Sequence, residues 1–528
     1  MLHSFKTSSF RAQTATGPEL SMLKSLLSVG GFTLLSRFSG FLRDIVQGAV
    51  LGAGFGADAF VVAQRLPNHF RAIFGEGAFN SAYVPSYSRV VQYEGVAGAR
   101  IFSGQIFSGL LASQIVLLAL AWAFTPAFID LLAPGFRADP EKFQLTVTLT
   151  RITFPYLLFI TLVTLQSGTL NAHGYFAAAA FAPVLMNLSM MLFLGVAFLF
   201  PNAGSAASWG MTVSGLLQLA FTSAAASRAG VLEKIARPAL TANVRQFLST
   251  LGPAVIGSAG TQIALFADTI ISSMLPTGGP SSIYYADRIY QLPLGVIGIA
   301  AGTVLLPEMS KLLAAGKPNA ALRAQTRTMA LSLALAAPFF VAFIMIPESI
   351  MRGVFLRGAF TAEAADASAA VLAAYGFGLV AFVLVRSAVA SFQAHGDTKT
   401  PMMIALTAVA INVALKIVLF TPLGAVGLAS ATAVGAWINL VLLVFLAIRR
   451  GAMKPDLLLW KTATAVTTAS AALAAFALFA ALPVERLVKG LGRFADASEL
   501  MILGLAGAAI YGVVLFIGLR IFGVKLRR

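Results

Sequence analysis

Long apolar runs recur along most of the 528 residues, and short polar segments separate them. A helix needs about 20 apolar residues to cross a bilayer. Fourteen runs approach that length, with approximate limits 25–48, 57–80, 101–130, 147–171, 176–200, 207–227, 246–275, 284–309, 329–351, 368–393, 402–421, 424–448, 460–482 and 499–522. They are too long for the alternating strands of about ten residues in a membrane β-barrel. The pattern therefore predicts an all-α polytopic membrane protein with about fourteen transmembrane helices.

Composition narrows the class of protein further. The chain is 58% hydrophobic and 11% charged, whereas a soluble domain is about a quarter charged. This excludes a soluble enzyme, a disordered protein and a nucleic-acid-binding module. The sequence has no cysteine and four histidines, so thiol catalysis and cysteine-ligated zinc are excluded. There is no Walker A loop for ATP, and we predict neither enzymatic activity nor a cofactor.

Lysine and arginine set the predicted orientation, because cytoplasmic loops are enriched in them. With the N-terminus inside, 21 of these residues fall in inner segments and 7 in outer segments. Both termini are therefore predicted to be cytoplasmic. Most of the net charge of +17 follows from this topology, so no nucleic-acid partner is needed.

Three short motifs indicate an internal repeat. Ala-His-Gly at 172–174 recurs at 394–396, and Pro85 recurs as Pro307, both at an offset of 222. Ala-Gln-Arg at 63–65 corresponds to Ala-Asp-Arg at 286–288, at an offset of 223. The shift spans six helices, so the two halves share one orientation and are related by an axis along the membrane normal.

The repeat predicts two six-helix lobes in a pseudo-two-fold arrangement, followed by a C-terminal helix pair. Such lobes are typical of transporters with alternating access to a central cavity. The predicted divisions are a cytoplasmic tail (1–21), an N-lobe (22–230), a C-lobe (231–450) and the final helix pair with a basic C-terminus (451–528).

Ionisable residues inside the spans are the main candidates for function, because each costs at least about 2.5 kcal/mol to insert. They gather in three spans: Arg37, Arg43 and Asp44 in the first, Asp58, Arg65, Arg71 and Glu76 in the second, and Asp287 and Arg288 in the eighth. Five arginines against four carboxylates predict a mildly positive cavity. Guanidinium groups bind phosphate through paired hydrogen bonds, which favours a phosphorylated ligand. The alternative is that these charges are buried ion pairs that fix helix register.

The last six spans carry few charges, so the sequence combines a positive cavity with wide apolar surface. This asymmetry suits a ligand with an anionic head and a long lipid tail, and the final helix pair could supply a groove for that tail. Ordinary packing against lipid is the alternative for those two helices.

Several motifs together resemble one family. They are Ser-Arg-Phe-Ser-Gly-Phe-Leu-Arg-Asp at 36–44, Gly-Ala-Gly at 52–54, Ala-Asp-Ala-Phe at 57–60, Leu-Pro-Asn at 66–68 with Arg71, Gly-Glu-Gly-Ala-Phe at 75–79, Tyr-Tyr-Ala-Asp-Arg at 284–288 and Gly-Thr-Val-Leu-Leu-Pro at 302–307. From about residue 22 to the end, the sequence resembles the MurJ (MviN) family. Members are lipid II flippases of the bacterial inner membrane in the multidrug/oligosaccharidyl-lipid/polysaccharide exporter superfamily, with fourteen helices in two lobes plus a C-terminal pair.

The resemblance implies specific roles. Arg37, Arg43, Arg71 and Arg288 would engage the substrate pyrophosphate, whereas Asp44, Asp58, Arg65, Asn68, Glu76 and Asp287 would be cavity or gate partners. The last two helices would hold the undecaprenyl tail. The implied substrate is lipid II, undecaprenyl-pyrophosphate-MurNAc(pentapeptide)-GlcNAc, with membrane lipids and cell-wall synthesis proteins as further partners.

The resemblance also marks a candidate cation region. Some members are thought to hold sodium between helices 7, 11 and 12, and the matching positions here are Asp268, Asn412, Lys416 and Thr432. Lysine stands where a carboxylate would help to hold the ion. We hypothesise that the Lys416 ammonium replaces sodium and pairs with Asp268. The alternative is that Lys416 extends to the outer interface.

Three other functions remain as alternatives. A flippase for another polyprenyl-linked glycan would share the same chemistry. A drug/cation antiporter of the same superfamily would need acidic rather than basic cavity residues. A scaffold for cell-wall enzymes would tolerate loss of the arginines. Either membrane potential or an ion gradient is the expected energy source, since one charge moved across 100 mV is worth about 2.3 kcal/mol.

Overall fold

The computed structural model describes residues 18–71 and 78–524. Within these ranges the chain forms helices and short connections without strands, which confirms the predicted all-α fold. The α-helices are α1 (Pro18–Leu51), α2 (Phe55–Arg71), α3 (Ala78–Leu132), α4 (Pro140–Thr153), α5 (Pro155–Ala172), α6 (Phe176–Gly195), α7 (Ala203–Arg228), α8 (Ala242–Ser273), α9 (Gly279–Pro293), α10 (Ile299–Ala314), α11 (Pro318–Met345), α12 (Pro347–Phe355), α13 (Ala362–Ala394), α14 (Lys399–Arg449), α15 (Leu457–Val488) and α16 (Ala495–Ile521). Three short segments are 3-10 helices: η2 (Pro134–Ala138), η3 (Ala197–Leu199) and η5 (Lys489–Phe494). The segment η4 (Leu294–Gly298) is a short π-helix.

Seven stretches of the described chain are long and apolar enough to cross a membrane. Two of them, α3 and α14, each comprise two helices joined at a sharp kink, because the backbone is non-helical at Gly95 in α3 and at Gly424 in α14. The bend in α14 separates the two runs predicted over 402–421 and 424–448. The multi-pass membrane architecture is therefore confirmed, whereas the number of fourteen separate spans stays a prediction.

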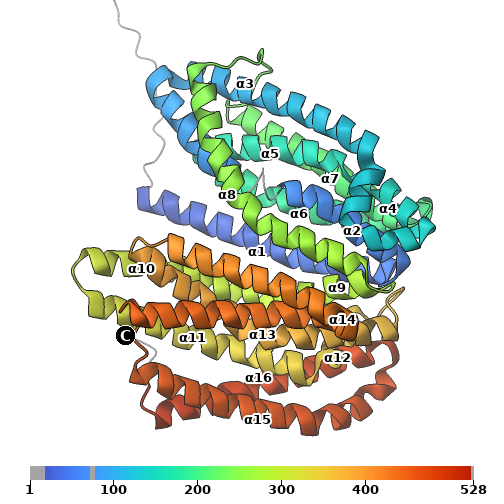
Figure 1. Cartoon of the computed structure of the whole chain (residues 1–528), viewed down its shortest axis with the longest axis vertical. Helices are drawn as coiled ribbons and strands as arrows, with labels where there is room; N and C mark the ends of the chain where they lie inside the picture. The colour runs from blue at the N-terminus through green and yellow to red at the C-terminus, as the bar shows by residue number, and fades with distance from the viewer. Residues whose placement is uncertain (1–17, 72–77, 525–528) are drawn as a thin grey trace, which may run out of the picture.

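The helices pack in two groups (Figure 1). We call α2–α7 the N-terminal group and α9–α14 the C-terminal group, and the α15–α16 pair packs on α11 and α12. Helix α1 lies between them, with α6 and α7 on one side and α9 and α12 on the other. Helix α8 also links the groups, because it contacts both α3 and α14.

Proline interrupts the α-helical hydrogen bonding within two of the predicted spans. In the run at 147–171, Pro155 has no N–H to continue the hydrogen-bond ladder and marks the boundary between α4 and α5, although Pro140–Ala172 remains one stretch that is long and apolar enough to cross a membrane. The run at 284–309 is likewise divided, because α9 ends at Pro293 and the wide turn η4 separates it from α10. As a result Asp287 and Arg288 lie in the middle of α9 rather than at the start of a long span.

The repeated Ala-His-Gly motif forms the same turn twice. His173 ends α5 and His395 ends α13, and each is followed by a glycine with positive φ, 82° at Gly174 and 79° at Gly396. Only glycine adopts this conformation without steric cost. These histidines therefore belong to helix ends that correspond in the two halves.

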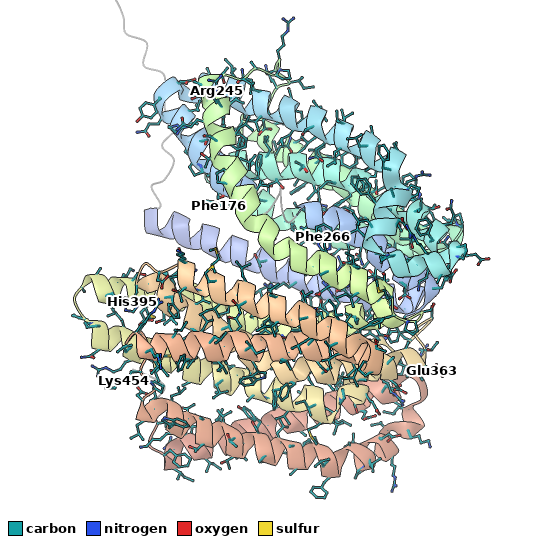
Figure 2. All side chains as sticks on the ribbon, viewed as in Figure 1. Phe176, Arg245, Phe266, Glu363, His395 and Lys454 are labelled. Carbon is teal, nitrogen blue, oxygen red and sulfur yellow. The ribbon has the colours of Figure 1, made fainter. Side chains whose placement is uncertain are left out.

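The labelled side chains mark the two ends of the bundle. Arg245, His395 and Lys454 lie toward one end, which we call the basic end, and Glu363 lies toward the other, which we call the opposite end (Figure 2). Helix α1 runs between them (Figure 1).

Asp58 joins the two groups at the opposite end. Its carboxylate, on α2, is fully buried. Oδ1 accepts from the backbone N–H and hydroxyl of Ser281 (2.9 and 2.7 Å), and Oδ2 accepts from the backbone N–H of Gly278 (2.8 Å). The Lys142 ammonium on α4 donates to Oδ2 at 2.7 Å and is itself 3% exposed. Asp58 thus combines a buried ion pair with the first N–H groups of α9.

Two further contacts close the opposite end beside Asp58. The Tyr285 hydroxyl donates to the carbonyl of Gly52 at 3.0 Å, and the Ala359 N–H donates to the carbonyl of Ala49 at 2.7 Å. Gly52 has a φ of 67° and lies so close to Ala359 that a Cβ at residue 52 would overlap the Ala359 carbonyl. The end of α1 is therefore held directly against the C-terminal group.

Glu233 anchors the connection between α7 and α8. Its Oε1 accepts from the Thr169 hydroxyl at 2.7 Å, and the Tyr83 hydroxyl bonds to Thr169 at 2.8 Å. Its Oε2 is buried and has no hydrogen-bond partner in the described part of the chain. Burial raises the pKa of the Glu233 carboxyl above its ordinary value. The connection is therefore tied to α3 and α5 through a carboxyl that favours its protonated form.

Asp58→Asn should destabilise the fold, because it leaves the buried Lys142 ammonium without its counter-charge. The expected loss is about 3 kcal/mol or more, measured as a lower melting temperature of the purified protein in detergent. Adding Lys142→Met should recover part of the loss, since no unpaired charge then remains. Equal melting temperatures for Asp58→Asn and the double variant would show that the pair is not coupled.

Glu233→Gln should stabilise the protein at neutral pH. A raised carboxyl pKa favours the folded state at low pH, and that contribution is lost as the pH rises through the folded pKa. The wild-type melting temperature should therefore fall more steeply above the ordinary carboxyl range than that of Glu233→Gln, with a difference of about 1–3 °C. Glu94→Gln, at an exposed glutamate on α3, is the matched control. Parallel pH profiles for wild type and Glu233→Gln would contradict the assignment.

Candidate functional site

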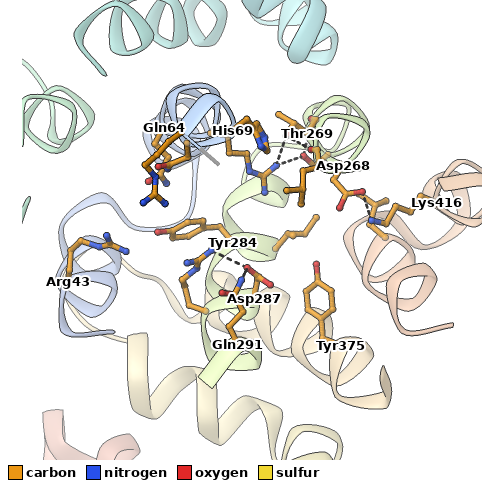
Figure 3. A pocket seen from close by; sticks show the side chains of 18 of the residues that line it. Arg43, Gln64, His69, Asp268, Thr269, Tyr284, Asp287, Gln291, Tyr375 and Lys416 are labelled. Carbon is orange, nitrogen blue, oxygen red and sulfur yellow. Dashed lines mark hydrogen bonds and ion pairs between the residues drawn. The ribbon is translucent and has the colours of Figure 1, made fainter. Parts of the chain in front are cut away.

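A cavity of about 490 Å³ lies between the two groups of helices. Its polar walls come from α1, α2, α8, α9, α13 and α14, whose side chains point toward one shared space in Figure 3. The charged and polar lining residues are Arg43, Gln64, Arg65, Asn68, His69, Arg71, Asp268, Thr269, Ser272, Tyr284, Asp287, Arg288, Gln291, Tyr375 and Lys416. Segments more than 350 residues apart in the sequence therefore build a single polar site.

Arg43 is held by side chains from three helices. Its guanidinium donates to Asp44 Oδ1 at 2.7 and 3.2 Å, and to Asn187 Oδ1 on α6 at 3.2 Å. The Tyr284 hydroxyl on α9 donates to the same Asp44 oxygen at 3.1 Å. Asn187 also donates to the Ser36 carbonyl at 3.0 Å. This network fixes the Arg43 guanidinium at the cavity wall.

Arg288 faces Arg43 across Tyr284. Its guanidinium donates to the neighbouring Asp287 at 3.1 Å, and its Cζ lies 4.8 Å from the centre of the Tyr284 ring. A cation over an aromatic face is attracted to the ring electrons. Tyr284 thus contacts Arg288 directly through its ring and is linked to Arg43 through the Asp44 carboxylate.

Arg65 has neutral partners instead of a carboxylate. It donates to the hydroxyls of Thr269 and Ser272 on α8, at 3.4 and 3.3 Å. One turn further along α2, the His69 ring lies 4.6 Å from that of Phe266, and Arg71 ends the helix at the cavity edge. Among the described residues, no carboxylate forms a direct ion pair with Arg65.

Among the described residues, the charges that line the cavity do not balance. Five of these lining residues are cationic and two are anionic: Arg43, Arg65, Arg71, Arg288 and Lys416 against Asp268 and Asp287. In a low-dielectric surrounding, like charges repel strongly. The site therefore favours a multiply charged anion.

The candidate cation region contains an ion pair. Lys416 Nζ donates to Asp268 Oδ1, and Lys416 is 4% exposed, so it does not extend to an interface. Asn412 instead donates to the Ala431 carbonyl, and the Thr432 hydroxyl donates to the Leu428 carbonyl. Among the described residues no cluster of three or more His, Asp or Glu side chains could hold a metal ion.

Some residues predicted for the site lie elsewhere. Arg37 is exposed and its guanidinium lies against Gly295 in η4, so it does not line the cavity. Asp44 lies behind Arg43, and Asp58 lies at the opposite end. Glu76 lies outside the described residues. Of the predicted site residues named here, Asp44 supports a cavity arginine from behind, and Asp58 belongs to the contacts at the opposite end.

The structure also brings in residues that the sequence did not single out. Lys142 was assigned to an outer loop, yet it forms the buried pair with Asp58. Asn187 and Tyr284 support the cavity arginines, and Tyr375 lines the wall. A polar asparagine in the apolar run 176–200 was a usable signal for Asn187. No sequence pattern linked Lys142 to Asp58, because 84 residues separate them.

A second, apolar groove lies outside the C-terminal group. It encloses about 540 Å³ between α11, α15 and α16, and its walls are almost entirely hydrocarbon. Tyr511 on α16 donates its hydroxyl to the carbonyl of Ala334 on α11 at 2.7 Å, which fixes the helix pair to that group. For this pair the sequence left open a groove for a lipid tail or ordinary packing against lipid, and its use for a tail stays a prediction.

Comparison with known sequences identifies the family. The family model described as "Lipid II flippase MurJ" matches residues 48–493. A probable lipid II flippase MurJ of Rhizobium meliloti strain 1021 is 42% identical over 94% of each chain. The lipid II flippase MurJ of Burkholderia cenocepacia is 34% identical over 83% of this chain and 86% of its own.

Solved structures show the same fold. An inward closed conformation of lipid II flippase MurJ has a TM-score of 0.75 at 23% identity, over 93% of this chain and 98% of that one. An inward-facing multidrug resistance transporter of the MATE family has a TM-score of 0.63 at 15% identity, over 79% and 97%. Together with the apolar helices, these matches identify a multi-pass protein of the bacterial inner membrane that belongs to the lipid II flippase MurJ family.

Proposed function

We propose that this protein is a lipid II flippase, which carries the undecaprenyl-pyrophosphate-linked peptidoglycan precursor from the inner to the outer leaflet. The observation that carries the proposal is the positive cavity between the two groups of helices, with five cations against two carboxylates. A pyrophosphate diester carries a negative charge on each phosphate, and guanidinium groups bind phosphate oxygens through paired hydrogen bonds. The names of the relatives agree with this chemistry.

Arg43 and Arg288 are the proposed primary pyrophosphate ligands, with Arg65 and Arg71 extending the site along α2. Tyr284 lies between the first two and restrains both. Their own carboxylate neighbours, Asp44 and Asp287, hold the guanidinium groups in place but leave donor N–H groups directed to the cavity. Arg37 would contribute at the edge toward the basic end, where it contacts η4.

The basic end is proposed to face the cytoplasm, which places both termini inside the cell. The proposed lobes are residues 22–230 and 231–450, and 451–528 would supply the helix pair for the tail. The polyprenyl chain would lie in the apolar groove between α11, α15 and α16. The tail then stays in a hydrocarbon environment while only the head crosses the protein.

In this proposal, the pyrophosphate drives alternating access by neutralising the positive charge of the cavity. The unliganded cavity holds mutually repelling cations, and binding of the pyrophosphate removes that repulsion. The liganded state can then favour a conformation that the empty protein populates less. Opening to the outside requires separation of the contacts at the opposite end, where Asp58 holds the start of α9. Membrane potential or an ion gradient would supply the energy, with no cofactor and no covalent step.

A drug/cation antiporter is disfavoured by the same cavity, although transporters of that kind share the fold. A cationic substrate would meet an excess of arginine. A flippase for another polyprenyl-linked glycan would use the same pyrophosphate contacts, so the assay must report lipid II itself. Contacts with cell-wall synthesis proteins are a further part of the proposal.

Arg43→Gln and Arg288→Gln should each reduce lipid II transport at least roughly tenfold, because each removes charged hydrogen bonds worth about 1.5–3 kcal/mol. The measurement is lipid II exposed on the outer face of cells depleted of their own flippase. Arg245→Gln, at an exposed arginine of α8, is the matched control. Full rescue by both cavity variants at normal membrane levels would show that these charges serve structure only.

Lys416 is proposed to replace a bound cation in the C-terminal group. Transport by the wild type should then be equal in sodium and potassium buffers. Lys416→Ala should lower the melting temperature and reduce transport, because it leaves Asp268 without its ammonium partner. Lys399→Ala, at the exposed start of the same helix, should change neither. Sodium stimulation of the wild type, together with a fully active and stable Lys416→Ala variant, would contradict the replacement.

A further inference from the structure

A third cavity lies on the outside of the C-terminal group, at its basic end. It encloses about 530 Å³ between α10 and α11, and its charged lining residues are Glu308, Arg323 and Arg327. Leu331 completes its wall and also lines the apolar groove between α11, α15 and α16. The basic cavity and the apolar groove therefore adjoin along α11.

One row of side chains on α11 runs through both cavities. Arg323, Arg327, Leu331, Leu335 and Phe339 recur every four residues, and each lines one or both of them. Residues four apart are neighbours on a helix surface. The three apolar members are 48%, 48% and 42% exposed. At 1.5 Å per residue, the row from Arg327 to Phe339 extends about 18 Å. It presents two cations followed by hydrocarbon.

The charges at the head of this row suit a phosphorylated group. Among the described residues that line the basic cavity, two are arginines and one is a carboxylate, which makes this lining net positive. Arginines four residues apart on a helix repel each other, and an anion bound between them relieves that repulsion. Arg323 is exposed, and its Nε donates to the Asn319 carbonyl of its own helix at 3.3 Å, so its remaining donors can turn to a ligand.

We propose that Arg323 and Arg327 form a loading site for the pyrophosphate of the incoming polyprenyl lipid, before its head enters the cavity between the two groups. The inference rests on the proposed function, which assigns the apolar groove to the polyprenyl tail. The pyrophosphate is bonded directly to the end of that tail. A tail that lies in the groove from the basic end therefore brings its pyrophosphate to the mouth that Arg323 and Arg327 form.

The doubly charged pyrophosphate fits this pair better than an ordinary phospholipid, which brings one phosphate charge per headgroup. Glu308 opposes the anion from α10 and limits how tightly it binds. Moderate affinity is needed here, because the lipid head must leave this site to enter the cavity between the two groups. The loading site thus raises the local concentration of substrate at the protein surface and leaves translocation to Arg43 and Arg288.

The test uses the full chain in nanodiscs of zwitterionic lipid, with undecaprenyl pyrophosphate as the probe. The Arg323→Gln/Arg327→Gln variant should associate with the probe roughly tenfold more slowly than wild type. Glu308→Gln should associate faster, because it removes the opposing charge. Arg449→Gln, at an exposed arginine at the end of α14, is the matched control and should not change the association rate. In reconstituted vesicles, the double glutamine variant should raise the lipid concentration needed for half-maximal flipping but keep the maximal rate within about twofold.

Association of the double glutamine variant at the wild-type rate would overturn the loading site. Equal displacement of the probe by phosphatidylglycerol would also overturn it and assign the pair to a phospholipid. Arg323→Gln alone, at an exposed position, provides the same test if the double variant is unstable. The Arg43→Gln/Arg288→Gln variant separates the two proposals: it should associate with the probe at a normal initial rate and fail to flip it. Normal flipping by that variant would instead refute the proposed function.

Discussion

The structure depends on how it holds several arginine side chains close together in its interior, where their positive charges repel one another. Arg43, Arg65 and Arg288 line one cavity. Arg43 and Arg288 are each held by the neighbouring carboxylate, and Arg65 is held by hydroxyls of α8. Because the described wall carries more cations than carboxylates, it retains positive charge for a ligand.

The internal repeat explains where the two groups meet. At the offset of 223 that relates 63–65 to 286–288, Asp58 corresponds to Ser281 and Arg65 to Arg288. Asp58 and Ser281 are in direct contact, as expected for equivalent residues close to a two-fold axis. The two halves nevertheless contain different ion pairs. Asp58 in the first half pairs with Lys142, whereas Lys416 in the second pairs with Asp268.

The sequence was most informative where the bilayer makes polar residues rare. The charges at 37–44, 58–71 and 287–288 stood out against apolar runs, and most of them do line the cavity or support it. The membrane helices could be predicted from the length of the apolar runs, because a helix needs about 20 apolar residues to cross the bilayer. The family resemblance was confirmed by sequence comparison.

Other features depend on three-dimensional packing and could not be predicted. The loss of one helical hydrogen bond at Pro155 was not predicted, because proline is tolerated in membrane helices when neighbours satisfy the freed backbone groups. The family resemblance placed Arg37 in the cavity, but its side chain lies against η4. Lys142 was read as an outer-loop charge, since its burial depends on the fully buried Asp58 and on Thr277.

The central claim is that the cavity closes toward the cytoplasm and opens toward the outer face when its arginines bind a pyrophosphate lipid. The chain has no cysteine, so Leu265→Cys places a single thiol in the cavity wall, at a position that is 44% exposed. The measurement is its alkylation by a membrane-impermeant maleimide, in inverted and in right-side-out vesicles. Undecaprenyl pyrophosphate should reduce labelling from the cytoplasmic face and increase it from the outer face, and Arg43→Gln/Arg288→Gln should abolish both changes. Labelling that is unaffected by the lipid, or that changes equally in the arginine variant, would contradict the account.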